Sequence, residues 1–327
     1  MEAWVLRESP GDYVLASVPD PVPGAGDVRV KVITSALNHM DMWLTQGRPR
    51  PHLPHVPGCD VAGVVEEVGQ DVRRDLLGAE VVVNPAVSCR RCRVCLAGES
   101  PLCREFQIVG EHRWGGHGAS VVVPMENVSP RPQGLSWEQS AAFGLAGLTA
   151  WRMLRRGRLQ AGETVLIVGV GGGVSSAALA LAVHMGAHVV VTSRDPDKRA
   201  TALERGAAQA LSSDDERWDV AADVVVESVG PATWDRSIHA LRPGGRLVVC
   251  GGTSGPTVEV SLPRLFFKQH EIIGSTMGSY EEWEQVVELM NQGVPVAVDE
   301  VFEIGDYPRA LSRLHGADQL GKIVLRH

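Results

Sequence analysis

Hydrophobic and polar positions follow two different patterns along the chain. In the first part, residues 28–33 alternate, 61–68 are rich in β-branched residues, and 80–83 form a short apolar run after a glycine. Short runs of this kind, bounded by turns, predict strands. Prolines punctuate the same region, and proline suits loops and sheet edges rather than helix interiors. The pattern predicts a compact β-rich domain over residues 1–147.

From residue 148 to residue 276, apolar strands alternate with helices. The runs VLIVG, HVVVTS, DVVVES, RLVVCGG and EIIGST are predicted as strands, and SSAALALAVHMG as a helix. This alternation is typical of an α/β fold, a doubly wound parallel sheet of the Rossmann type. Ligands of such sheets bind at the carboxyl ends of the strands. The last segment, 277–327, contains one more helix and a closing strand over 322–325.

Three of the helices begin at recognisable capping residues. Ser136 and Ser279 are each followed three residues later by Gln or Glu, which predicts a capping box. Asp195 is followed by proline, which predicts an N-cap and a first helical turn.

Composition and charge limit the classes of partner. The chain has 327 residues, of which 44% are hydrophobic and 21% charged, and this suits two globular domains. Its net charge of −8 argues against a nucleic-acid partner or an anionic membrane surface. The apolar stretch 165–191 is interrupted by glycines and histidines, so it predicts strands and a helix rather than a membrane span. No secretory signal is visible at the start, and we expect a cytoplasmic protein.

Four cysteines form the strongest motif. Cys89, Cys92, Cys95 and Cys103 have the spacing C-x2-C-x2-C-x7-C within a loop of residues 88–104. Four thiolates satisfy the tetrahedral preference of zinc and leave no position for water or substrate, which predicts one structural zinc. Two disulfides are the alternative, and a cytosolic chain argues against them.

A glycine turn lies between a predicted strand and the following helix. Gly169, Gly171, Gly172 and Gly173 allow close approach of a pyrophosphate, which the helix N-terminus stabilises, and Val174 stands where the literal G-x-G-x-x-G motif has its last glycine. Inside a βαβ unit, this turn predicts dinucleotide binding.

The end of the next strand bears on which dinucleotide binds. Ser193, Arg194 and the nearby Lys198 offer hydroxyl and cationic groups, which suit the 2′-phosphate of NADPH. Asp195 is the alternative, because an acidic residue at this place accepts hydrogen bonds from the ribose of NADH.

With these motifs in view, the chain resembles the medium-chain dehydrogenase/reductase superfamily. The resemblance includes ALNHMDMWLTQG, PHVPGCDVAGVVEEVG, the cysteine lobe, the glycine turn and the final GKIVL. It implies a GroES-like catalytic domain over 1–147, a Rossmann domain over 148–276, and a return to the first domain over 277–327. It also implies a small-molecule substrate in the cleft between the domains and a homodimer or homotetramer.

The resemblance allows a check for a second, catalytic zinc. The family's zinc alcohol dehydrogenases take ligands from segments that here contain Asn38, Cys59 with Asp60, and Leu145. The usual ligand set is largely absent, so we expect no catalytic zinc, with an atypical site at Cys59 and Asp60 as the alternative. The zinc-independent quinone oxidoreductase-like branch is the nearer match, because its glycine turn resembles GVGGGVSSAA and it carries an asparagine at the position of Asn38.

The candidate catalytic residues follow from the same segments. Asn38 is predicted to orient the substrate or the nicotinamide ribose, and Asp41 and Asp60 to order the pocket or shuttle a proton. His112 is a candidate general acid, because histidine exchanges protons near neutrality, with an exposed loop histidine as the alternative. By the family match, His39 contacts the cofactor pyrophosphate.

Further cofactor contacts are expected where later strands end. The segments after these strands contain small residues, and we expect their backbone groups to contact the nicotinamide. The residues concerned are Val229, Gly251, Thr253 and Ser275.

Three functions remain open from the sequence. The first is an NADPH-dependent reductase of quinones, enones or other activated carbonyls without a catalytic zinc. Such a reductase suits conjugated acceptors, because conjugation spreads the negative charge that develops during the reaction. The protein then has less charge to stabilise without a metal. The second is an alcohol dehydrogenase with an atypical metal site. The third is a nucleotide-binding protein without turnover.

Overall fold

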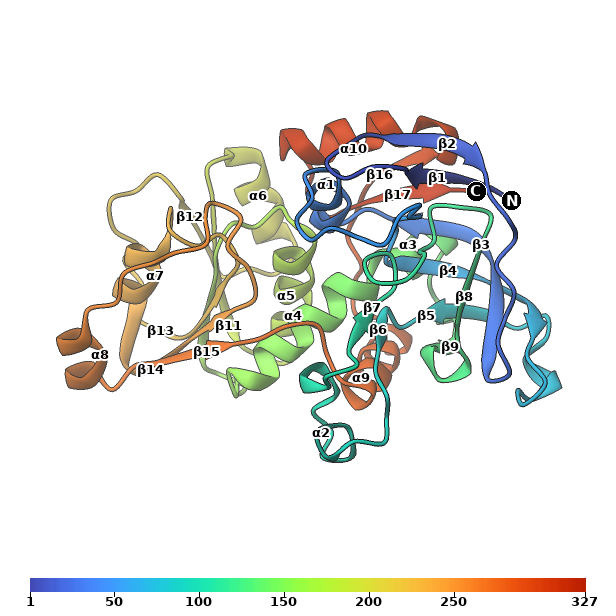
Figure 1. Cartoon of the computed structure of the whole chain (residues 1–327). Helices are drawn as coiled ribbons and strands as arrows, with labels where there is room; N and C mark the ends of the chain where they lie inside the picture. The colour runs from blue at the N-terminus through green and yellow to red at the C-terminus, as the bar shows by residue number, and fades with distance from the viewer. The chain divides into compact units, whose positions relative to one another are not determined.

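The computed structural model describes residues 1–327, and the chain divides into two compact units. Unit 1 comprises Met1–Leu145 and Gly278–His327, and unit 2 comprises Ala146–Met277. Both ends of the chain lie in unit 1 (Figure 1). The chain therefore leaves unit 1 after Leu145, within helix α4 (Gly144–Arg156), and returns at Gly278.

Unit 1 is built on a seven-stranded sheet with the order β16-β17-β3-β4-β5-β9, in which β8 also pairs with β3. Buried valines of β3, β4, β5 and β8 form one of its cores. The elements of unit 1 are β1 (Glu2–Leu6), β2 (Tyr13–Ser17), β3 (Asp27–Ala36), α1 (His39–Thr45), β4 (Asp60–Val68), β5 (Glu80–Val83), β6 (Ala86–Val87), α2 (Arg93–Leu96), β7 (Gln107–Ile108), β8 (Ser120–Pro124), β9 (Val128–Pro130), α3 (Trp137–Ala142), α9 (Tyr280–Asn291), β16 (Val298–Glu303), α10 (Tyr307–Gly316) and β17 (Lys322–Arg326). Four short 3-10 helices, Arg74–Leu76, Ser100–Leu102, Met125–Asn127 and Ile304–Asp306, complete it.

The strands predicted in the first part of the chain are confirmed as β3, β4 and β5. The N-terminal hairpin of β1 and β2 was not predicted. Residues 3–6 are all buried, so β1 lacks the alternation of polar and apolar positions that identifies a half-buried strand.

Unit 2 is a six-stranded sheet in which every neighbouring pair is parallel, with the order β12-β11-β10-β13-β14-β15. This confirms the predicted doubly wound sheet, and Figure 1 shows α5 and α7 on opposite sides of it. Its elements after α4 are β10 (Thr164–Ile167), α5 (Gly173–His184), β11 (His188–Ser193), α6 (Pro196–Glu204), β12 (Gln209–Ser212), β13 (Ala222–Glu227), α7 (Trp234–Ala240), β14 (Leu241–Val249), α8 (Leu262–Lys268) and β15 (Glu271–Gly274).

The predicted helix caps are confirmed. Ser136 and Ser279 each accept the backbone N–H three residues later and complete a capping box. The side chain of Asp195 accepts the backbone N–H groups of Asp197 and Lys198 at the start of α6. These local bonds explain why the helices begin where the sequence indicates.

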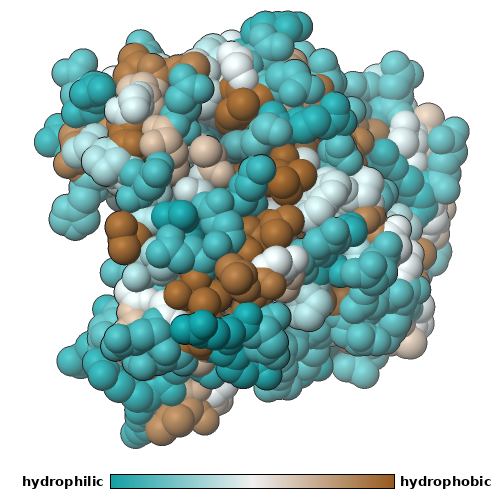
Figure 2. Space-filling model, turned by 90° about the vertical axis from the view of Figure 1, so that its right-hand side faces the viewer, coloured by the Kyte–Doolittle hydropathy of each residue, from teal (hydrophilic) through white to brown (hydrophobic).

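The face of the molecule drawn in Figure 2 is largely hydrophilic. Figure 2 shows teal residues over most of the face drawn, with hydrophobic residues appearing between them in patches. None of the helices combines the length and the apolar character that crossing a membrane requires.

Candidate functional site

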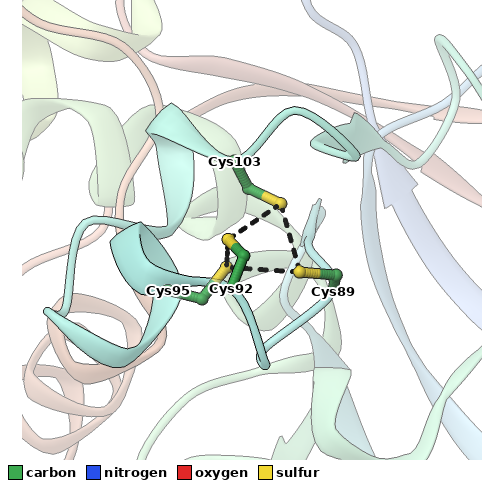
Figure 3. A group of neighbouring side chains, drawn as sticks. All are labelled: Cys89, Cys92, Cys95 and Cys103. Atoms are coloured by element: carbon green, nitrogen blue, oxygen red, sulfur yellow. Dashed lines mark hydrogen bonds between the residues drawn. The ribbon is translucent and has the colours of Figure 1, made fainter.

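The four cysteine side chains converge in a lobe of unit 1. Their Sγ atoms all lie within 4.8 Å of one another, and Figure 3 shows them facing a common centre. Neighbouring Sγ atoms are 3.5 Å apart for Cys92 and Cys95, 3.8 Å for Cys92 and Cys103, 3.5 Å for Cys103 and Cys89, and 3.9 Å for Cys89 and Cys95. Four sulfurs bonded at about 2.3 Å to one zinc lie about 3.8 Å apart in a tetrahedron. The residues fit a zinc ion held by protein alone.

The backbone around the cysteines prepares them for a metal. Arg90 adopts a left-handed conformation with φ 56°, and Cys92 is the N-cap of the short helix α2. The backbone N–H groups of Arg91 and Cys92 lower the pKa of the Cys89 thiol to about 6. The thiolate that zinc binds is therefore favoured at neutral pH for Cys89, whereas burial raises the pKa of the Cys95 thiol to about 11.

A second group of polar residues in unit 1 is centred on Lys322. Its Nζ atom donates to the backbone oxygen of Leu37 at 2.6 Å, to Oδ1 of Asn38 at 2.7 Å and to Oδ2 of Asp60 at 2.8 Å. Lys322 is 5% exposed and Asp60 is 0% exposed. Because an ammonium group has three protons, these three acceptors use all of them.

The Asp60 carboxylate is fully engaged. Its Oδ1 atom accepts the backbone N–H of Leu145 at 2.5 Å, and its Oδ2 atom accepts both Lys322 and Nδ2 of Asn38, the latter at 2.9 Å. Gly144 has no side chain here because a Cβ would collide with Oδ1 of Asp60. Asp60 therefore has no free oxygen for a metal ion, and an internal cation already balances its charge.

The residues around Asp60 do not complete a catalytic metal site. Cys59 is 0% exposed, and burial, followed by the charge of Asp41, raises the pKa of its thiol well above the usual value. Its Sγ atom lies 3.8 Å from the sulfur of Met40. The four-cysteine lobe is the only group in the chain where three or more histidine, cysteine or carboxylate ligands converge. The ligand set of a catalytic zinc does not fit this site.

Asp41 lies at the centre of a further buried cluster that the sequence did not reveal. Its Oδ2 atom accepts the backbone N–H of Asn38 at 2.8 Å and lies 3.6 Å from Nε2 of His117. Nδ1 of His117 contacts the hydroxyl of Ser35 at 3.0 Å, and the His117 ring packs against Tyr307 with centroids 4.9 Å apart. Asp41 and His117 are 0% exposed, so this cluster fixes the start of α1 rather than meeting a ligand directly.

The two remaining candidates of unit 1 differ in burial. His39 begins α1 and is half-buried, and burial, followed by the charge of Lys322, lowers its pKa. His112 lies in an exposed loop, where its Nδ1 atom accepts the backbone N–H of Ile108 at 3.2 Å. The structure therefore places His39 next to the Lys322 group and leaves His112 outside that group.

In unit 2, the glycine turn follows β10 and leads into α5. Gly169 and Gly171 have φ of 76° and 151°, conformations that favour glycine, and Gly172 is the N-cap of α5. The hydroxyl of Ser175 donates to the backbone oxygens of Gly169 and Gly172 at 2.9 and 3.0 Å. The Ser175 hydroxyl thus ties the turn to the N-terminus of α5, beside Gly173 and Val174, where this fold binds a pyrophosphate.

The end of β11 presents the groups predicted to select the cofactor. Thr192 is fully buried, and its hydroxyl accepts the backbone N–H of Gly169 at 3.0 Å, so it supports the glycine turn. Asp195 is used as the N-cap of α6. Arg194 is exposed, whereas Ser193 is buried and its hydroxyl accepts the backbone N–H of Asp195 at 3.2 Å. Lys198 lies in the first turn of α6.

The other predicted cofactor residues lie beyond the carboxyl ends of β13, β14 and β15. Val229 follows β13 and accepts Ser254 through its backbone oxygen, and Thr253 donates its backbone N–H to Ser228 at 3.3 Å. Gly251 is half-buried, and the backbone N–H of Ser275 bonds to Val249 at 2.8 Å. All four residues lie at the edge of the sheet where ligands of this fold bind.

Comparisons with known proteins identify the family of the chain. Residues 24–133 match the model of the alcohol dehydrogenase GroES-like domain, and residues 173–292 match that of the zinc-binding dehydrogenases. A probable cinnamyl alcohol dehydrogenase of Populus deltoides is 31% identical, with 98% of this chain and 94% of that protein covered. An acryloyl-coenzyme A reductase of Metallosphaera sedula is 29% identical, with 99% of each covered. Among solved structures, an NAD-dependent alcohol dehydrogenase is similar with a TM-score of 0.95 and 36% identity over 100% of both chains.

Proposed function

Because the chain belongs to the medium-chain dehydrogenase/reductase family, we propose that it is an NADPH-dependent reductase of enones, quinones and other activated carbonyls that works without a catalytic zinc. The family assignment makes the chain an oxidoreductase that transfers hydride with a nicotinamide cofactor. The proposal concerns the acceptor, the metal and the choice of cofactor.

The observation that carries the proposal is the ion pair of Lys322 and Asp60. The ammonium group supplies an internal positive charge at the only buried carboxylate of the segment from which the family draws a metal ligand. A zinc ion at this place would have to displace Lys322, and no three histidine, cysteine or carboxylate ligands converge there to hold it. The residues support chemistry that does not need a Lewis acid at the acceptor.

Asn38 is the residue we assign to the acceptor. One proton of its Nδ2 group is donated to Asp60 at 2.9 Å, whereas the other faces the backbone oxygen of Ala36 at 3.5 Å, beyond the usual hydrogen-bond length. That second N–H is available to the oxygen of a bound carbonyl. Lys322 and Asp60 hold the amide in one orientation, as a preorganised donor requires.

The overall reaction balances as one enone, one NADPH and one proton giving one saturated carbonyl compound and NADP⁺. When bound, NADPH supplies the hydride. The N–H of Asn38 stabilises the negative charge that conjugation moves to the carbonyl oxygen, and solvent supplies the proton. The similarity to an acryloyl-coenzyme A reductase supports a conjugated acceptor.

NADPH is the cofactor that the end of β11 supports best. Asp195, which would bind the ribose of NADH, caps α6 through its Oδ1 atom. The exposed Arg194 and the helix residue Lys198 add positive charge at the same place. A cationic and hydroxyl-bearing strand end suits a 2′-phosphate, and NADH is the alternative that titration distinguishes.

We also infer a structural zinc, a cytoplasmic location and self-association. The four-cysteine lobe supports the zinc, and six cysteines without a disulfide support a reducing compartment. Leu262, Phe266 and Phe267 of α8 are 65%, 59% and 78% exposed, and such apolar exposure supports a homodimer or homotetramer. Light scattering of the purified protein measures the assembly directly.

The decisive assay follows NADPH oxidation with a panel of enones and quinones and, in reverse, NADP⁺ reduction with alcohols. We expect turnover with conjugated acceptors and none with simple alcohols. Asn38→Ala should lose turnover by about 100-fold while NADPH still binds. Asn291→Ala, at the exposed end of α9, is the matched control and should behave as the wild type.

Two results would contradict the proposal. Turnover of simple alcohols that depends on added zinc would favour an alcohol dehydrogenase with an atypical metal site. Tight NADPH binding without turnover on any acceptor would favour a nucleotide-binding protein.

A further inference from the structure

Glu227 is a fully buried carboxylate without a cationic partner. It is the last residue of β13 and is 0% exposed. Its Oε1 atom accepts the backbone N–H groups of Val229 at 2.6 Å and Gly230 at 3.0 Å. Its Oε2 atom accepts the hydroxyls of Thr233 at 2.9 Å and Ser237 at 2.5 Å. Glutamate is rarely buried to this degree unless a charge or a ligand pairs with it.

The four hydrogen bonds shape one loop. Val229 and Gly230 form the turn that leaves β13, and Thr233 and Ser237 belong to the start of α7. The ionised carboxylate accepts all four donors and needs no proton of its own. Glu227 therefore fixes the backbone at the carboxyl end of β13 and keeps a negative charge there.

The position of β13 in the sheet connects this loop to the cofactor. The strand order reverses between β10 and β13, and a dinucleotide binds across this switch point. The glycine turn after β10 belongs to the half of the sheet that binds the pyrophosphate and the adenosine. The nicotinamide is therefore expected at the other half, which runs from β13 to β15. The two halves adjoin, because a Cβ on Gly169 would lie 3.4 Å from a methyl group of Val229.

The charge of Glu227 reaches the neighbouring strand end. Cys250 follows β14, and its backbone N–H bonds to the backbone oxygen of Glu227 at 3.1 Å. Burial, followed by the charge of Glu227, raises the pKa of the Cys250 thiol to about 12. The same negative charge therefore acts on groups at this edge of the sheet.

We propose that Glu227 is a positioning residue of the nicotinamide half-site whose negative charge favours the oxidised cofactor over the reduced one. The reduced nicotinamide ring is neutral, and it gains one positive charge when it gives a hydride, two electrons and one proton, to the acceptor. A fixed negative charge at the same sheet edge stabilises that cation and assists hydride donation. The inference rests on the proposed function for the identity of the cofactor.

The test compares the binding of oxidised and reduced cofactor. Dissociation constants for NADP⁺ and NADPH are measured by calorimetry on the full-length wild type and on Glu227→Gln, and NAD⁺ with NADH replaces this pair if the protein prefers it. Two unit charges within about 12 Å change a dissociation constant by about tenfold at an effective dielectric constant of about 20. We expect Glu227→Gln to weaken NADP⁺ about tenfold more than NADPH.

Thr233→Val is the matched control for loop position. It removes one hydroxyl from the Glu227 carboxylate and leaves the charge in place. A purely positional effect changes the affinities of NADP⁺ and NADPH together, so we expect their ratio in this variant to stay within about twofold of the wild type.

A second pair of variants keeps the inference testable if Glu227→Gln does not fold. Cys250→Asp adds a second carboxylate at the same sheet edge, and Cys250→Ser is its uncharged control. Both are titrated at about pH 9, because the burial and the charge of Glu227 that raise the pKa of the Cys250 thiol also raise that of an aspartate there. We expect Cys250→Asp to bind NADP⁺ several-fold more tightly relative to NADPH than Cys250→Ser does. An unchanged ratio in the charge variants overturns this inference alone. A wild type that binds neither cofactor overturns the proposed function as well.

Discussion

Replacing Lys322 with methionine is the most informative change in unit 1. Methionine has a similar length but carries no charge and donates no hydrogen bond. The variant leaves the Asp60 carboxylate at 0% exposure without its cation, and it leaves the oxygens of Leu37 and Asn38 without their donor. The local fold depends on this group because Lys322 joins β17 to the start of β4.

The expected loss follows from the burial of the pair. Removing one partner of a buried ion pair costs about 3–5 kcal/mol, because the other charge remains in a site with little water. For a unit of this size, one kcal/mol shifts Tm by about 2–4 °C. Lys322→Met should therefore lower the Tm of unit 1 by about 10 °C.

Differential scanning calorimetry measures this loss in the full-length protein. Arg326→Met is the matched control on the same strand, because its ion pair with Glu138 is exposed. Exposed pairs contribute little, so the control should melt within about 2 °C of the wild type. Adding Asp60→Asn to Lys322→Met removes the unpaired charge and should recover part of the loss.

The outcome of the double variant separates charge from packing. If Lys322→Met melts like the Arg326 control, the ammonium group is not the buried partner of Asp60. If Lys322→Met is unstable but Asp60→Asn restores nothing, the loss comes from packing rather than from an uncompensated charge. Either result would refute the reasoning that places an internal cation where a metal would bind.

Three further predictions concern histidine, cysteine and zinc. Burial, followed by the charge of His117, lowers the pKa of His327 from 6.5 to about 3. Between pH 6.5 and pH 3, this histidine is therefore protonated in the unfolded chain but not in the folded chain. Stability should therefore fall as the pH falls through this window, and urea titrations of His327→Gln should show a weaker pH dependence. The raised pKa of Cys250 predicts slow alkylation by iodoacetamide at pH 8, which mass spectrometry should find accelerated in Glu227→Gln and unchanged in Thr233→Val. Cys103→Ser should lose the zinc and melt at a lower temperature, and a variant that keeps one zinc per chain by metal analysis would contradict the four-cysteine site.

The sequence predicted the doubly wound sheet well because each of its signals is local. Runs such as 188–193 are buried on both faces around three consecutive valines, and the caps at Asp195 and Ser279 bond to residues two or three positions away. The cysteine lobe is equally local, since Cys89 and Cys103 lie only 14 positions apart. Interactions between residues close in sequence therefore determine both the ends of these elements and the metal ligands.

The Lys322 group could not be predicted in the same way. Lys322 and Asp60 are 262 positions apart, and only the arrangement of β17, β3 and β4 brings them together. The sequence marked Lys322 as the start of a strand, where a lysine normally faces water. A resemblance over GKIVL was the one signal that pointed to it. Ser35 and His117 were missed for the same reason, because their contact joins β3 to a distant loop.

The roles of Asp60 and Glu227 show where side-chain detail changes a prediction. From the sequence, Asp60 was a candidate for ordering the pocket, shuttling a proton or holding an atypical metal. The structure engages both of its oxygens with donors from Lys322, Asn38 and Leu145. From the sequence, Glu227 was only part of the run DVVVES, which was predicted as a strand. The structure shows that four hydrogen-bond donors surround its carboxylate and that no cationic side chain pairs with it.

The central claim, hydride transfer with a single structural zinc, is tested most directly by the zinc content of active protein. Plasma mass spectrometry and NADPH oxidation with an enone are measured on the same sample before and after treatment with a chelator. We predict one zinc per chain and an unchanged rate for as long as the protein stays folded. Two zincs per chain, with turnover lost when the second is removed, would contradict the account.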